Sequence, residues 1–139
     1  MKTFPALTAA DRTRLLHLAR EAMARAYAPY SQTRVGAALL THRGNTFVGV
    51  NVENAAYGLT ICAERAAVFA AVAREGPEMR IRALAVVSQA DAPFPPCGAC
   101  RQVLQEFGPQ AVVLFQGAQG LQELSAADLL PQAFRLPER

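Results

Sequence analysis

The stretch IRALAVVSQADAPFPPCGACRQVLQEFGPQAVVLF, residues 81–115, sets the architecture expected for this chain. It begins with the almost unbroken apolar run Ile81–Val87 and ends with a second one, Ala111–Phe115. Apolar runs of this length are typical of strands that are covered on both faces, so we expect both in the middle of a sheet. Gly98–Phe107 between them is predicted to be a helix, and two strands connected through a helix pair in parallel.

The sequence before this unit predicts two more helices and a hairpin. Thr8 can cap a first helix that extends to about Tyr27, and the alanine-rich segment Cys62–Arg74 predicts a second helix. Val35–Leu40 and Thr46–Asn51 have the composition of two short strands, and the residues between them are typical of a tight turn. This part of the sheet is therefore expected to be antiparallel.

The sequence after the unit predicts one more strand, Gly117–Leu124, and a capped helical turn, Ser125–Leu130. No repeat, linker or low-complexity segment interrupts the pattern, so residues 1–139 are expected to form a single domain. The predicted fold class is α/β: a three-layer α/β/α sandwich with helices on both faces of one mixed sheet of about five strands.

Composition limits the possible partners. The net charge of +3 comes from scattered arginines rather than a basic run, so we expect no nucleic-acid partner. The N-terminal segment MKTFPALTAADRTRLL lacks the apolar core of a signal peptide, and charges interrupt every apolar run. The expected protein is cytoplasmic and does not cross a membrane. Charged residues make up only 18% of the chain, which favours buried contacts between subunits.

The three cysteines, Cys62, Cys97 and Cys100, are the candidate metal ligands. Their odd number in a reduced compartment argues against a disulfide framework. Cys62 and the pair Cys97 and Cys100 lie at the N-terminal ends of two predicted helices, where backbone N–H groups and the helix dipole favour thiolates. Three thiolates that leave one tetrahedral position for water are typical of a catalytic zinc site, so we expect one Zn²⁺ per subunit. His17 and His42 lie away from the cysteine motifs and are not taken as ligands.

Two charged residues directly follow Cys62. Glu64 lies two residues after the candidate ligand Cys62, so its side chain can approach a metal-bound water without coordinating the metal. This position favours Glu64 as a proton shuttle and hence as the catalytic residue. Arg65 is expected to donate hydrogen bonds to cysteine sulfur, because three thiolates leave the zinc site with a net charge of about −1.

The motif C-x-E at residues 62–64, followed by P-C-x-x-C at residues 96–100, matches the three-cysteine variant of the zinc nucleobase deaminase signature. Together with the segments PYS, VGAAL, NVENAAYGLTICAERAA and PCGACRQVLQEFG, it resembles the small cytidine deaminases from Tyr30 to about Phe107. The resemblance implies zinc-dependent hydrolytic deamination of cytidine or deoxycytidine to uridine or deoxyuridine plus ammonia, in pyrimidine salvage. It also implies a homotetramer with active sites shared between subunits.

The resemblance further assigns the substrate contacts. Asn51 and Glu53 are expected to hydrogen-bond the ribose hydroxyls. The backbone of Ala63 is expected to contact the pyrimidine. Tyr57 resembles a family tyrosine near the ribose, and Phe134 resembles an aromatic residue that reaches the site of a neighbouring subunit.

The sequence departs from the family pattern at one point. Small cytidine deaminases usually carry an aromatic ring, which packs on the base, two residues after the position of Ser31, whereas this chain has Thr33. Phe134 or Phe94 is a candidate to replace that ring. Two alternative functions stay open at this point: a deaminase of another aminopyrimidine nucleoside, such as a nucleoside antibiotic, and a non-catalytic zinc-stabilised module.

Overall fold

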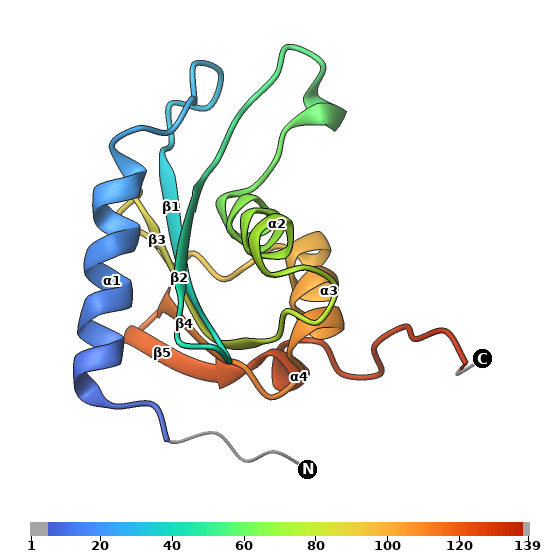
Figure 1. The fold of residues 1–139 in the computed structure, drawn as a ribbon. Coiled ribbons are helices and arrows are strands. Elements are labelled where there is room, and N and C mark those ends of the chain that lie inside the picture. The colour runs from blue at the N-terminus through green and yellow to red at the C-terminus, as the bar shows by residue number, and fades with distance from the viewer. Residues whose placement is uncertain (1–5, 138–139) are drawn as a thin grey trace.

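A five-stranded sheet with the order β2-β1-β3-β4-β5 forms the centre of the fold (Figure 1). A computed structural model describes residues 6–137 of the chain. The strands β3 and β4 pair in parallel and all other neighbours pair antiparallel, so the sheet is mixed, as predicted. The strands are β1 (Val35–Thr41), β2 (Thr46–Val50), β3 (Ile81–Ser88), β4 (Val112–Gly117) and β5 (Gly120–Ser125).

Helices cover both faces of this sheet, which confirms the predicted three-layer α/β/α sandwich. The long helix α1 (Ala9–Met23) lies on one face, whereas α2 (Ala63–Glu75), α3 (Gly98–Phe107) and the short α4 (Ala126–Leu129) lie on the other (Figure 1). A 3₁₀ helix, η1 (Tyr57–Leu59), lies in the long loop between β2 and α2.

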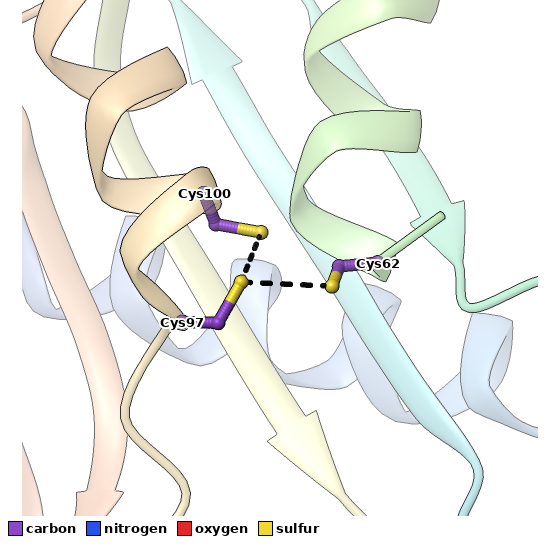
Figure 2. A group of neighbouring side chains, drawn as sticks. All are labelled: Cys62, Cys97 and Cys100. Atoms are coloured by element: carbon purple, nitrogen blue, oxygen red, sulfur yellow. Dashed lines mark hydrogen bonds between the residues drawn. The ribbon is translucent and has the colours of Figure 1, made fainter. Parts of the chain in front are cut away.

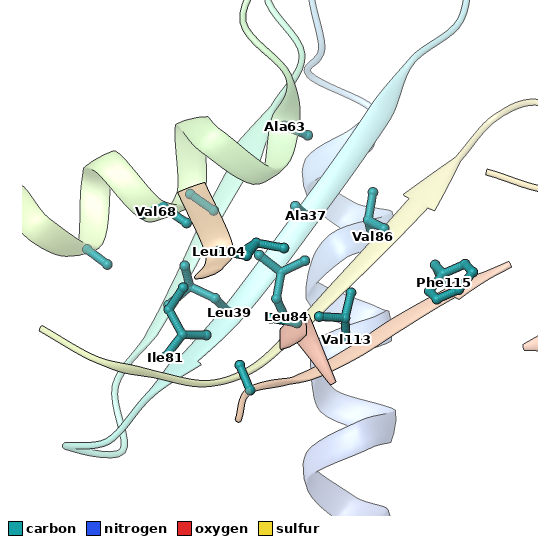
Figure 3. Packing of buried hydrophobic residues seen from close by; sticks show 14 of the residues in the cluster. Ala37, Leu39, Ala63, Val68, Ile81, Leu84, Val86, Leu104, Val113 and Phe115 are labelled. Atoms are coloured by element: carbon teal, nitrogen blue, oxygen red, sulfur yellow. The ribbon is translucent and has the colours of Figure 1, made fainter. Parts of the chain in front are cut away.

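The apolar strands separate two hydrophobic clusters. Leu39, Leu84 and Val113 point toward α2 and α3 and belong to the larger cluster (Figure 3). Their sequence neighbours Ala38 and Leu114 point toward α1 and belong to the smaller one. Because successive side chains of a strand point to opposite faces, a strand with helices on both sides must be apolar throughout. This explains the unbroken apolar runs in the sequence.

Two predicted element boundaries are wrong. The first helix ends at Met23 rather than near Tyr27, because the backbone of Tyr27 pairs with the segment after β2: its N–H donates to the carbonyl of Asn51 at 3.0 Å, and its carbonyl accepts from the N–H of Glu53 at 2.9 Å. The last strand begins at Gly120 rather than Gly117, since the chain between these two residues forms the turn that connects β4 to β5.

The helix caps follow the prediction. The hydroxyl of Thr8 accepts a hydrogen bond from the N–H of Asp11 at 3.0 Å, and the Asp11 carboxylate accepts one from the N–H of Thr8, which forms a complete capping box. Ser125 caps α4 through the N–H of Asp128. Within residues 6–137, every helix is too short or too polar to cross a bilayer. The expectation for the N-terminal segment rests partly on residues 1–5, which lie outside the described residues.

Candidate metal centre and substrate pocket

The fold brings the three cysteines together at the N-termini of two neighbouring helices. Cys62 is the N-cap residue of α2, Cys97 is the N-cap residue of α3, and Cys100 lies in the first turn of α3 (Figure 2). The Sγ atom of Cys97 lies 3.7 Å from that of Cys62 and 3.5 Å from that of Cys100. All three sulfur atoms lie within 4.8 Å of one another. The two helix N-termini therefore converge on one sulfur cluster.

The spacing of the sulfur atoms fits a tetrahedral zinc ion. Zn–S bonds of about 2.3 Å at tetrahedral angles place two sulfur atoms about 3.8 Å apart. A disulfide requires about 2.05 Å, so the observed distances belong to free thiols. Three sulfur ligands leave one corner of the tetrahedron for water or substrate, which is the composition of a catalytic rather than a structural zinc site.

Arg65 contributes a positive charge to the sulfur cluster. Its Nη2 atom donates a hydrogen bond to Cys62 Sγ at 3.4 Å. A hydrogen bond from Cys100, followed by the one from Arg65, lowers the pKa of Cys62 to about 5. The same contact with Cys62, together with burial, raises the pKa of Cys100. The positive charge of Arg65 therefore favours the thiolate form of Cys62.

Arg101 holds the segment that carries Cys97. Its Nε atom donates to the carbonyl of Pro96 at 2.7 Å, and its Nη1 atom donates to the carbonyl of Leu129, at the end of α4, at 3.0 Å. With these two hydrogen bonds, the guanidinium group connects Pro96, the residue before Cys97, to the end of α4. The motif P-C-x-x-C-R contains this arginine but does not indicate its role, because its two carbonyl partners come close to it only in the folded chain.

Glu64 lies beside the sulfur cluster in the first turn of α2, and only 2% of its surface is exposed. Burial raises the pKa of Glu64 to about 7, and the charge of Cys62 acts in the same direction. A carboxyl group with a pKa near neutrality can both accept and donate a proton at physiological pH, which suits a general acid and base.

The cluster opens into a pocket of about 440 Å³. Cys62, Glu64 and Cys97 line the pocket at the metal end, and Asn51 and Glu53 also line it. Other lining residues have small or apolar side chains, among them Thr33, Val35, Ala63 and Phe94. One cavity of this size therefore combines part of the sulfur cluster, a buried carboxyl group and several further polar side chains, the usual composition of a small-molecule site.

Asn51 and Glu53 have a structural task that the sequence did not reveal. The Asn51 side chain accepts a hydrogen bond from the N–H of Val35 and donates one to the carbonyl of Thr33, both at 2.9 Å. The Glu53 carboxylate accepts hydrogen bonds from the hydroxyl and N–H of Ser31 and from the N–H of Tyr30. The Ser31 hydrogen bonds lower the pKa of Glu53. Both side chains hold the segment before β1 against the pocket.

Tyr57 and Phe134 lie outside the pocket of a single chain: neither belongs to the residues within 6–137 that line it. Tyr57 is 76% exposed, and its ring meets the ring of Tyr30 edge-on at a centroid distance of 6.0 Å. Phe134 is 70% exposed, and its carbonyl accepts a hydrogen bond from Gln102. The segment with Phe134 leaves the sandwich beside α4 (Figure 1).

Comparison with known proteins agrees with this geometry. Residues 9–116, which include all three cysteines, match the family model described as the cytidine and deoxycytidylate deaminase zinc-binding region. The chain belongs to this deaminase family. The cluster of Cys62, Cys97 and Cys100 lies within this zinc-binding region and is positioned to bind a metal ion.

Several members of the deaminase family match most of the chain. The cytidine deaminase of Halalkalibacterium halodurans is 48% identical over 126 residues, which are 89% of this chain and 94% of the relative. The crystal structure of cytidine deaminase from Burkholderia pseudomallei superimposes with a TM-score of 0.80 at 48% identity, covering 88% of this chain and 98% of that one. The enzyme from Mycobacterium tuberculosis superimposes with a TM-score of 0.79 at 44% identity, covering 91% and 98%.

Proposed function

We propose that this protein catalyses the hydrolytic deamination of cytidine or deoxycytidine to uridine or deoxyuridine plus ammonia. The observation that carries the proposal is the shared pocket: Cys62 and Cys97 of the three-thiol cluster line the same cavity as the buried Glu64 and as Asn51 and Glu53. Cytidine deaminases that are 43–48% identical to this protein over most of the chain support the same reaction.

Zinc held by Cys62, Cys97 and Cys100 supplies the Lewis acidity that makes water a nucleophile near neutral pH. We assign the proton transfers to Glu64. Its carboxylate accepts one proton from the attacking water and delivers it to ring nitrogen N3, while the oxygen bonds to C4. It then carries the second water proton to the exocyclic amine. The C4–N bond breaks, ammonia leaves, and the carbonyl of uridine forms, so both protons of the water are accounted for.

The remaining residues of the pocket position the substrate. We assign the ribose hydroxyls to Asn51 and Glu53, because each retains unused lone pairs beside the hydrogen bonds it makes to the chain. The backbone of Ala63 lies at the metal end and is assigned to the pyrimidine ring. Arg65 offsets the negative charge of the thiolates and thereby helps the zinc to acidify water.

We further propose a homotetramer in which subunits complete one another's active sites. Several apolar side chains are exposed in the single chain, including Tyr57, Phe134, Phe69 and Val52. An assembly that covers these side chains would remove apolar surface from water, and it would give Tyr57 and Phe134 a place near a neighbouring pocket. Light scattering at working concentration tests this proposal. If the protein is a monomer, Phe134 cannot contribute to the active site of a neighbouring subunit.

We place the enzyme in the cytoplasm, in pyrimidine salvage, with residues 1–139 as one catalytic domain. The three free thiols support a reducing compartment, since oxidation to a disulfide would remove two zinc ligands. The substrate proposed is a free nucleoside, which is what a salvage enzyme consumes.

The decisive experiment combines zinc analysis with an ultraviolet absorbance assay on a panel of cytidine, deoxycytidine and other aminopyrimidine nucleosides. We expect one zinc per subunit and turnover of cytidine or deoxycytidine. The variant Glu64→Gln should retain zinc but lose turnover by a factor of about 10² to 10⁴. Glu106→Gln, an exposed glutamate of α3, is the matched control and should behave like the wild type.

Each failure of this experiment has a separate meaning. Zinc-loaded protein that turns over neither nucleoside contradicts the proposed function, and activity confined to another aminopyrimidine nucleoside supports the antibiotic-type alternative instead. Full turnover by Glu64→Gln leaves the reaction in place but removes Glu64 as the proton shuttle.

A further inference from the structure

We infer that Phe94, in the loop between β3 and α3, is the residue against which the pyrimidine base packs, and that it sets the affinity for the base. This inference rests on the proposed deaminase function. Phe94 is the one aromatic side chain among the described residues that line the pocket. Thr33 lines the same pocket and provides no ring. Among the described residues of one chain, Phe94 is thus the side chain that offers this pocket a flat apolar surface for a planar substrate.

The position of Phe94 is fixed before any ligand binds. Its N–H donates a hydrogen bond to the carbonyl of Gln116, in β4, at 2.8 Å. Its side chain is partly buried against the larger hydrophobic cluster, so the ring rests on the core of the domain. Pro93 and Pro95 flank it and restrict the backbone on both sides. A ring held in this way costs little conformational entropy when a ligand packs on it.

The layout of the pocket directs the base toward this ring. The reacting atoms C4 and N3 must lie near Glu64 and the sulfur cluster, and the sugar is assigned to Asn51 and Glu53. The base then lies between these two groups in the same pocket, which Phe94, three residues before Cys97, also lines. Planar bases stack favourably on aromatic side chains whatever their hydrogen-bonding pattern.

The test compares Phe94→Leu with Phe94→Tyr. Loss of an aromatic partner weakens base binding by about five- to hundredfold, and leucine keeps part of the apolar contact. We expect Phe94→Leu to raise KM for cytidine and deoxycytidine by about fivefold to tenfold, with kcat within about twofold of the wild type, because uniform binding is lost. The inhibition constant of uridine should rise in parallel. Phe94→Tyr, which keeps the ring, should retain a KM near the wild-type value.

Two further variants separate stacking from a structural role. Phe107→Leu changes a ring that packs on the same hydrophobic cluster but does not line the pocket, so it should lower stability without a change in KM. Thr33→Phe, added to Phe94→Leu, supplies a ring from a different wall of the pocket and should bring KM back toward the wild-type value.

The outcomes distinguish this inference from the proposed function. An active wild type with unchanged KM and uridine inhibition in Phe94→Leu overturns the inference alone. Loss of zinc and of kcat at constant KM in Phe94→Leu also overturns it, since Phe94 would then only hold the loop of Cys97. A wild type that deaminates no pyrimidine nucleoside overturns the proposed function first and the inference with it.

Discussion

Gly49 of β2 and Ala63 of α2 are in direct backbone contact: a Cβ atom added to Gly49 would lie 2.4 Å from the carbonyl oxygen of Ala63. It would lie equally close to the N–H nitrogen of Ala67. Only glycine allows this approach, because every other residue carries a Cβ atom. Ala63 lies between Cys62 and Glu64, so the position of the strand determines where α2 presents the zinc ligand and the carboxyl group.

We therefore predict that Gly49→Ala destabilises the protein by about 1 to 3 kcal/mol, the usual cost of an overpacked site. The variant should also bind zinc more weakly, because the first turn of α2 must shift. Thermal unfolding and zinc analysis measure both effects. Gly58→Ala is the control, since a Cβ atom there meets no other atom within 4 Å. Equal stability of the two variants would contradict the proposed contact.

Zinc removal should lower stability as well as activity, because a metal that binds only the folded chain stabilises it. At a free zinc concentration of about 100 times the dissociation constant, this contribution is about 2.7 kcal/mol. Adding a strong chelator should thus lower the melting temperature of the wild type. Cys97→Ala should contain no zinc, and its melting temperature should not respond to the chelator. A response equal to that of the wild type would mean that Cys97 is not a ligand.

Arg65→Gln should weaken zinc binding by about 10- to 100-fold, as is typical when a partner of a metal ligand is removed. The physical reason is the hydrogen bond from Arg65 Nη2 to Cys62 Sγ. Competition with a chromophoric chelator measures the change. Arg74→Gln, at the exposed end of the same helix, is the matched control and should leave the affinity unchanged. If both variants bind zinc like the wild type, Arg65 does not support the site.

Asn51→Ala should cost about 1 to 3 kcal/mol, because the N–H of Val35 loses its acceptor in a buried environment. KM should rise at the same time, as the segment with Thr33 loses its anchor. Urea denaturation and steady-state kinetics give the two quantities. Asn54→Ala removes an exposed side-chain hydrogen bond to the N–H of Ala56 and should cost clearly less. A smaller effect at Asn51 than at Asn54 would argue against the anchoring role.

The amino-acid sequence alone determined the elements and the ligand set of this protein. The apolar runs at Ile81 and Ala111 predicted buried strands, and the helix between them was predicted with its observed bounds, Gly98–Phe107. Cys62, Cys97 and Cys100 were predicted to share a metal from their types and positions, and their sulfur atoms do converge. These features could be predicted because side-chain periodicity and helix starts are local properties of the chain.

Other features exist only in the tertiary structure. The first helix ends at Met23 because Tyr27 pairs with residues that follow β2 in the chain, and no local pattern reports such a partner. Tertiary packing also determines the two hydrogen bonds that Arg101 donates to backbone carbonyls. It likewise determines that Phe94 lines the pocket. The physical reason is that these contacts join segments far apart in sequence, whose distance is set by the packing of the whole sandwich rather than by their own residues.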